Sequence, residues 1–143
     1  MAGANVDSGH GCAVVFGTSS WTADILSISF GGTTRGAIPT SHMGTTATTS
    51  GGFGSQTYIP ASLDDAGELT LSCHFDADTT VPVGLVAETI TITWPKVAAD
   101  ATAATWAFSG FVTGHSNEAT WDDKMTCDLT IQISGKVTQV VAA

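Results

Sequence analysis

Hydrophobic and polar residues alternate with a period of two along three stretches of the chain. In "KMTCDLTIQIS" (124–134) the apolar side chains fall on every second residue: Met125, Cys127, Leu129, Ile131 and Ile133. The same alternation occurs in 88–94 and in 68–75. Successive side chains of a strand point to opposite faces, so each stretch predicts a strand with one buried and one solvent-facing side.

Weaker patterns predict further strands at 12–17, 24–30, 104–116 and 136–141. We expect Leu26, Ile28 and Phe30 to share a face, Gly110 to mark a bulge, and 136–141 to form a last edge strand.

Helical patterns are confined to 60–67 and 79–87, and Pro82 and Gly84 limit the second to a turn or two. The prediction is an all-β domain spanning 1–143. It is a β-sandwich or partly open barrel of about seven or eight antiparallel strands, with one short helix.

The chain is poor in charge and acidic. Charged residues make up 12% of the sequence, and four scattered cations stand against 13 acidic residues, for a net charge of −9. A phosphate backbone would be repelled, so a nucleic-acid-binding module is excluded, although passive contact with DNA is not. We find neither a signal-peptide pattern nor an apolar run long enough to span a membrane, so we expect folding in the cytoplasm.

Candidate catalytic and metal-binding residues are few. Ser41 and His42 are adjacent, so on an extended chain their side chains point apart, and a hydrolase using them is improbable. Asp76 and Asp78 lack the remaining ligands of a calcium loop and favour a turn, as do Asp122 and Asp123. The three cysteines form no disulfide or zinc pattern, and Cys73 and Cys127 fall on apolar faces, which indicates buried thiols. We expect no catalytic residue, cofactor or metal.

Four tryptophans leave one binding function open. Trp21, Trp94, Trp106 and Trp121 could form a platform for sugars, which would make the chain a carbohydrate-binding β-sandwich on a virion or cell surface. Core packing is the commoner fate of strand tryptophans.

An uncharged segment rich in Thr, Ser and Gly separates two of the predicted elements. No Lys, Arg, Asp or Glu occurs in 36–62. Loops of more than about 12 residues in a compact domain are usually functional or disordered. The wet faces at 89–93 and 126–132 are also nearly uncharged, which suits contact with copies of the same chain.

The order of several stretches resembles the major tail tube proteins of long-tailed bacteriophages. The likeness covers most of the chain and is carried by "AIPTSHMGTT" (37–46), "YIPASLDDAGELTLSCHFDAD" (58–78), "ETITITWP" (88–95), "ATWAFSGFVTGHS" (104–116) and "WDDKMTCDLTIQISGKV" (121–137). Cys12, Cys73 and Cys127 depart from the family pattern, as do Gly110 and His115.

The resemblance implies a structural role without catalysis or cofactor. Members of this family form hexameric rings that stack into a tail tube, the conduit for genome ejection. The implied location is the virion tail. The implied partners are copies of the chain and other tail proteins (tape measure, terminator, baseplate or tip), with DNA passing through the lumen unbound and no membrane involved.

The composition and the resemblance together predict two sets of functional residues. We expect the loop at about 40–56 to be mobile in the monomer and ordered in the tube, with Phe53 as its apolar anchor. The predicted inter-subunit contacts are Thr40, His42, Met43, Thr45, Thr46, Phe53 and Gln56. We expect at least one of Glu68, Glu88 and Asp128 to line the channel, since they are the charged members of faces otherwise rich in threonine.

Overall fold

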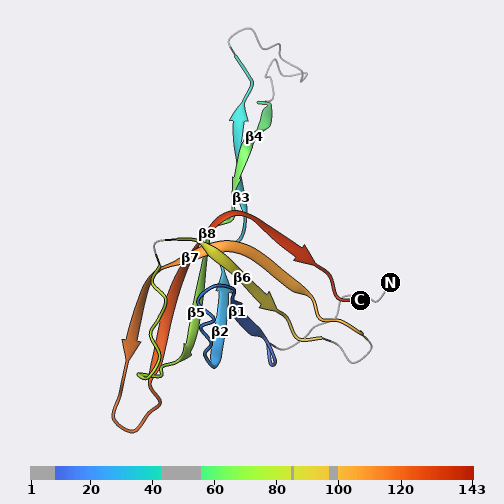
Figure 1. Cartoon of the computed structure of the whole chain (residues 1–143). Coiled ribbons are helices and arrows are strands. Elements are labelled where there is room, and N and C mark those ends of the chain that lie inside the picture. Colours follow the sequence, from blue (N-terminus) through green and yellow to red (C-terminus); the bar gives the residue numbers. More distant parts are fainter. Residues whose placement is uncertain (1–8, 43–55, 85, 97–99) are drawn as a thin grey trace. The chain divides into compact units, whose positions relative to one another are not determined.

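The fold consists of strands alone. The computed structural model describes residues 9–42, 56–84, 86–96 and 100–143. Its strands are β1 (Ala13–Phe16), β2 (Ile25–Phe30), β3 (Thr34–Pro39), β4 (Tyr58–Asp65), β5 (Glu68–His74), β6 (Glu88–Thr93), β7 (Thr105–Glu118) and β8 (Thr126–Val140) (Figure 1). The prediction of an all-β fold with seven or eight strands is confirmed.

The predicted short helix is wrong for the described residues, which contain no helix. Residues 60–65 belong to β4, whose hydrogen bonds go to β3 instead of along a helix. Pro60 is tolerated there because a two-stranded sheet leaves half of its backbone N–H groups unpaired. In 79–87, the described residues are bends and irregular chain, as Pro82 and Gly84 favour. The described part of the chain therefore also holds no helix that could cross a membrane.

The chain divides into two compact units. The larger contains 1–32 and 66–143, and the smaller contains 33–65. The smaller unit is the antiparallel pair β3–β4, and the larger is a six-stranded sheet in the order β1-β6-β7-β8-β5-β2. That the whole chain acts as a single tail-tube domain stays a prediction.

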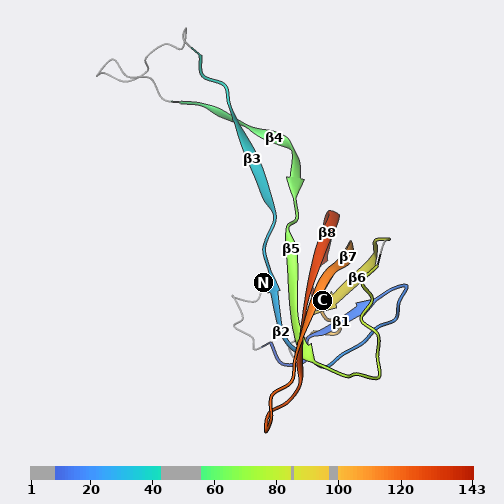
Figure 2. The ribbon, with the colours of Figure 1, turned by 90° about the vertical axis from the view of Figure 1, so that its left-hand side faces the viewer.

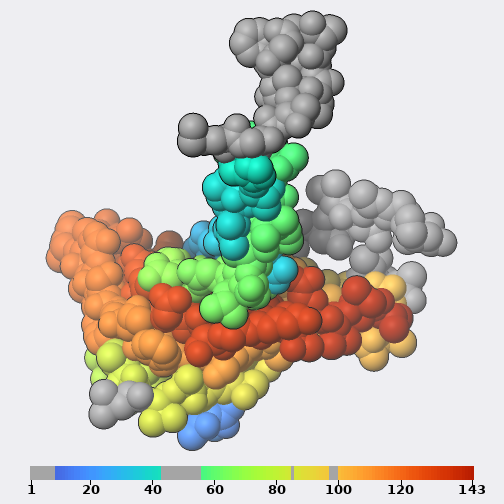
Figure 3. Space-filling model, turned by 90° about the horizontal axis from the view of Figure 1, so that it is seen from above, coloured from blue at the N-terminus to red at the C-terminus, as the bar shows by residue number. Residues whose placement is uncertain are grey.

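The six-stranded sheet curls into a partly open barrel. Every neighbouring pair is antiparallel, and Figure 1 shows β7 and β8 arching over the two edge strands, β1 and β2. The curl brings Phe30 on β2 against Trp106 on β7, with ring centroids 5.5 Å apart, although two strands separate them in the sheet. The space-filling view shows β8 (red) running across the larger unit with β7 (orange) beside it (Figure 3).

The core fills the concave side of this sheet. Alternate residues of the central strands are buried, as the period-two pattern predicts. Seven of them are 0% exposed, and Cys127 is 2% exposed; the seven are Leu69, Leu71, Cys73, Ile90, Ile92, Leu129 and Ile131. No charged or polar side chain is buried among the described residues. The core is therefore held by apolar packing alone.

Cys73 and Cys127 face each other across β5 and β8. They are directly paired, and the Cys73 thiol donates a hydrogen bond to the Cys127 carbonyl at 3.4 Å. Burial, followed by the neighbouring Cys127, raises the pKa of the Cys73 thiol to about 12. Both thiols are free and buried, so the prediction of buried thiols is confirmed at these two positions.

Three local expectations differ from the structure. Leu26 is 45% exposed because the β2–β5 register shifts between Ile25 and Ser27, which turns it away from Ile28 and Phe30. Residues 136–140 are no separate edge strand, since they continue β8 beyond Gly135 and pair with β7.

The register shifts in β7 flank Gly110, which itself pairs with Ile133. A Cβ there would lie 2.9 Å from the Gln132 carbonyl oxygen, so the glycine permits a close backbone approach.

Candidate functional site

The β3–β4 pair is a hairpin with almost no buried surface. Every residue of β3 is exposed, and in β4 only Ala61 is partly buried. Ile38 and Ile59 are opposite each other in the register and are 47% and 50% exposed. Tyr58 and Leu63 are 58% and 84% exposed. An isolated two-stranded sheet is marginally stable in water, so these apolar side chains form a surface suited to a partner.

Polar contacts hold the two strands together at both ends of the hairpin. The Arg35 guanidinium lies 3.5 Å from the Asp64 carboxylate, and these residues are paired in the register. At the other end the Thr40 N–H donates to the Thr57 carbonyl at 2.9 Å, and the two threonine hydroxyls are 2.6 Å apart. The Ser41 hydroxyl oxygen accepts a hydrogen bond from the Thr57 N–H at 2.9 Å. Ser41 thus extends the ladder and has a structural role.

The predicted inter-subunit residues fall partly within this hairpin end. Thr40, His42 and Gln56 are exposed and flank the base of the predicted loop. The other predicted contacts, Met43, Thr45, Thr46 and Phe53, lie outside the described residues. Their contact role stays a prediction.

Sequence reasoning missed β3 and the apolar surface of the hairpin. The available signal was a repeated Ile-Pro dipeptide, at 38–39 and 59–60. A residue before proline favours extended backbone, and proline suits the edge of a sheet.

The convex face of the six-stranded sheet is polar and nearly neutral. Most of its central residues are serine, threonine and glutamine, and Ala107 and Phe111 are apolar members of the same face. The polar ones are Thr70, Ser72, Thr89, Thr91, Ser109, Thr130, Gln132 and Ser134. Glu68 and Asp128 are the acidic residues among them, opposite Gln132 and Ser72 respectively. Both are exposed, as expected.

Glu88 does not belong to this face, which corrects the expectation. Glu88 lies two residues before Ile90 and four before Ile92 on the same strand, so its side chain points to the same face as theirs. The Ile90 and Ile92 side chains are in the core. Its carboxylate accepts hydrogen bonds from the Ser19 N–H at 2.9 Å and the Ser19 hydroxyl at 2.8 Å. Glu88 therefore anchors the chain after β1 at the rim of the core.

The tryptophans do not gather into a sugar-binding platform. Trp21 is 8% exposed and packs edge-on against Phe16, with ring centroids 5.4 Å apart. Trp94 and Trp106 pack against each other inside the curl at 5.1 Å. Trp121 is 94% exposed and stands apart from these three. Core packing accounts for Trp21, Trp94 and Trp106.

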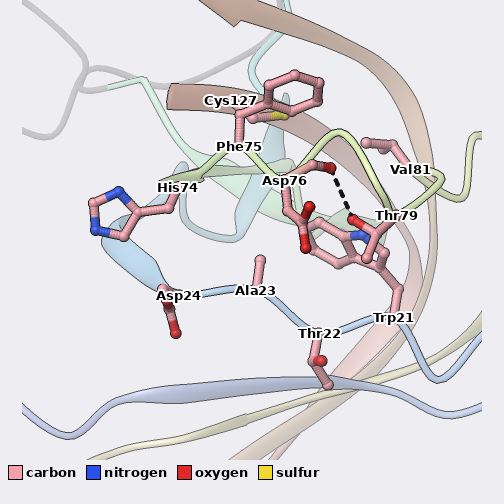
Figure 4. A pocket seen from close by; sticks show the side chains of 10 residues that line it. All are labelled: Trp21, Thr22, Ala23, Asp24, His74, Phe75, Asp76, Thr79, Val81 and Cys127. Carbon is pink, nitrogen blue, oxygen red and sulfur yellow. Dashed lines mark hydrogen bonds between the residues drawn. The ribbon is translucent and has the colours of Figure 1, made fainter. Parts of the chain in front are cut away.

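A cavity of about 290 Å³ opens beside Trp21 (Figure 4). Its titratable lining residues are Asp24, His74, Asp76 and Cys127. Figure 4 shows the His74 ring turned away from Asp76 and Trp21. Asp76 is engaged in a turn, as predicted, because its carboxylate accepts a hydrogen bond from the Asp78 N–H at 2.9 Å. Within the described part of the chain, no three His, Cys, Asp or Glu side chains could hold a metal ion.

Comparisons with known proteins identify the fold. No protein-family model and no curated protein matches the sequence. Among solved structures, one similar chain belongs to the sheath/tube terminator of the PVC extracellular contractile injection system. The TM-score is 0.72 at 16% identity, covering 98% of this chain and 100% of that one.

Two further structures agree with this match. A chain of the tube-terminating cap of the anti-feeding prophage gives a TM-score of 0.72 at 17% identity, covering 99% of this chain and 95% of that one. A chain from the tail of an empty GTA particle, determined with C6 symmetry, gives 0.62 at 8% identity, covering 95% and 100%. The chain has a tail-tube-type fold. This confirms, at the level of the fold, the resemblance seen in the sequence.

Proposed function

We propose that this chain is a non-catalytic structural protein of a phage or phage-like tail, which assembles as hexameric rings stacked into a tube. The observation that carries the proposal is the β3–β4 hairpin, whose Ile38, Tyr58, Ile59 and Leu63 side chains are exposed. A neighbouring copy would bury them, and each apolar side chain buried contributes roughly 1.5–3 kcal/mol. The six-fold symmetry of the similar GTA tail is the basis for proposing hexamers.

The charge distribution supports a lumen through which DNA slides. The chain carries a net charge of −9, and the convex face presents hydroxyl and amide groups with Glu68 and Asp128. Lys136 of β8 is the one cation among the strand residues of the six-stranded sheet, so such a face would bind a duplex weakly. We propose that this face lines the channel, and that the tube serves as the conduit for genome ejection from the virion.

Concentrated purified protein is expected to form rings or long tubes visible by negative-stain electron microscopy. The dilute protein is expected to be monomeric, because each contact between copies is small and assembly depends on concentration. A chain that remains monomeric beside preformed tail initiation complexes would contradict the proposal.

Reversing charge on the convex face is expected to make tubes retain DNA. The change is Glu68→Lys with Asp128→Lys, and both positions are exposed, so tubes should still form. The measurement is cosedimentation of tubes with duplex DNA at low and high salt, since retention through lysine should weaken as salt rises. Glu88 is left unchanged because its carboxylate binds Ser19.

The matched control has the same charge change away from this face, Asp24→Lys with Asp78→Lys, both exposed. It should leave DNA in the supernatant. Equal DNA retention by the two variants, or no retention by either when tubes are intact, would show that Glu68 and Asp128 do not line the channel.

A second candidate function is the terminal ring that ends such a tube. The terminator and cap chains give higher TM-scores, 0.72, than the GTA tail chain, 0.62. A terminal ring would stack on a tube but not on itself. Single rings without long tubes at high concentration would favour this role, and long tubes would exclude it.

A further inference from the structure

The tip of the β7–β8 hairpin presents a tryptophan on a defined turn. The Asp123 N–H donates to the Thr120 carbonyl at 3.3 Å, and the Lys124 N–H donates to the Asp123 carboxylate at 2.7 Å. Asp122 has φ +71°, the left-handed conformation that the third residue of a type II turn requires. Trp121 precedes it and is 94% exposed. Figure 2 shows this orange-red tip extending beyond the rest of the sheet.

A cavity able to hold such a side chain lies between the two edges of the curled sheet. Its volume is about 470 Å³. One wall is the chain around Cys12, just before β1, and the other is β2 with Ile25, Leu26 and Ile28. Trp94 completes the lining, and its indole nitrogen is buried with no hydrogen-bond partner. The site is therefore mainly apolar.

Charge distinguishes this cavity from two others as a receptor for the tip. The tip carries Glu118, Asp122 and Asp123 against Lys124. The cavity beside Trp21 is lined by Asp24 and Asp76, and a third, near Ser19, is lined by Glu88. The cavity between β1 and β2 has no carboxylate in its lining, and neither does a fourth cavity, lined by Lys136, Val137, Thr138 and Gln139. Of these two, the cavity between β1 and β2 has the more apolar lining, with Ile25, Leu26, Ile28 and Trp94. An acidic tip is repelled by the cavities beside Trp21 and near Ser19, and not by the cavity between β1 and β2.

We propose that Trp121 of one copy inserts into the cavity between β1 and β2 of a second copy. This contact rests on the proposed assembly of copies, and it adds an interface separate from the β3–β4 hairpin. Trp121, the knob of this contact, and the cavity are on different surfaces of one chain. The contact is therefore heterologous and continues from copy to copy around a ring or along a filament.

The contact contributes to assembly without sustaining it alone. A buried tryptophan covers about 150–250 Å², whereas a stable interface buries about 1,600 Å² in total. Buried tryptophans are nonetheless frequent hot spots, and loss of one weakens association on the order of 10- to 100-fold.

Site-directed cross-linking tests the position of the contact. In a Cys12→Ser background, Thr120→Cys places a thiol beside the knob and Ser27→Cys places one at the cavity. A short bis-maleimide is expected to link the two positions between copies under assembling conditions, giving covalent dimers and higher ladders by denaturing electrophoresis. Adding Trp121→Ala should abolish the link. The control pairs Thr120→Cys with Thr89→Cys, an exposed position on β6 outside the cavity, and should not cross-link.

A double-mutant cycle tests the energetics. Trp121→Ala and Leu26→Asp are each expected to raise the protein concentration needed for assembly about 10- to 100-fold, and the double variant should be no worse than either single variant. Val15→Asp is the matched control, since Val15 is an exposed edge-strand residue outside the cavity lining. The Val15→Asp variant should assemble at a lower protein concentration than the Leu26→Asp variant.

The outcomes separate this contact from the proposed function. Two results would overturn the Trp121 contact and leave the tube role standing. One is the formation of normal tubes without the cross-link, and the other is additivity of the Trp121→Ala and Leu26→Asp effects in the double variant. Absence of any assembly in the unmodified protein would overturn both.

Discussion

Replacing Leu129 with alanine is expected to lower the free energy of unfolding by about 2–5 kcal/mol, and Ile131→Ala by a similar amount. Both side chains are 0% exposed in β8, where Leu129 pairs with Leu71 of β5 and Ile131 with Leu69. Removing methyl groups here leaves a cavity between strands that cannot move closer without breaking their hydrogen bonds. Urea denaturation followed by circular dichroism measures the change as a shift of the midpoint at constant slope.

Thr130→Ala is the matched control, because it changes the residue between these two on the opposite face of the same strand. Its carbonyl accepts a hydrogen bond from the Thr113 hydroxyl, and the substitution keeps that carbonyl. The expected change is within about 0.5 kcal/mol. Equal destabilisation by all three substitutions would mean that β8 does not bury one face only.

Deleting 46–52 is expected to give a folded monomer that cannot stack. The core residues that the structure describes lie outside 46–52, and so do the threonine and serine hydrogen bonds that join the hairpin end, at Thr40, Ser41 and Thr57. Circular dichroism should therefore keep its cooperative thermal transition, whereas negative-stain microscopy should show no tubes.

Phe53→Asp is expected to have the same effect as the deletion, because it replaces the large apolar group of the loop with a charge that is costly to bury. Phe53→Leu, which keeps an apolar side chain, should still assemble. Amide hydrogen exchange across 40–56 should slow on assembly in the unmodified protein. Equal exchange before and after assembly, or normal polymerisation of the deletion variant, would refute the assembly role of this loop.

Strands with one fully buried face were predictable from the sequence. In β5, β6 and β8 each buried residue alternates with a polar one, and the structure places Leu71, Ile92 and Leu129 in the core as the pattern requires. A strand with one buried face needs an apolar residue at every second position, so this alternation in the sequence indicates a buried face. The order of the strands in the sheet, by contrast, depends on pairings between distant residues, which local periodicity does not encode.

The hairpin and the exposure of Leu26 were not predictable in the same way, whereas the position of Glu88 was. No residue of β3 is buried, so the hydrophobic effect leaves no periodic pattern there. The shift that exposes Leu26 depends on pairing with β5, and the inward position of Glu88 depends on its hydrogen bonds to Ser19. The prediction assigned Glu88 to the solvent-facing side from its charge alone. Its position two residues before Ile90 would have assigned its side chain to the inward side.

The central position of the last strand has a consequence for when the chain can fold. β8 joins β7 to β5, and β1 pairs with β6, so Ala13 meets Thr93 only after a long stretch of chain has been made. A ribosome-bound chain that lacks 126–140 cannot unite the two halves of the sheet, and its strand edges and apolar faces stay exposed. Non-local pairing of this kind also slows folding. In the proposed assembly, synthesis and polymerisation would thereby be separated in time, because a nascent chain could join other copies only once β8 has been inserted into the sheet.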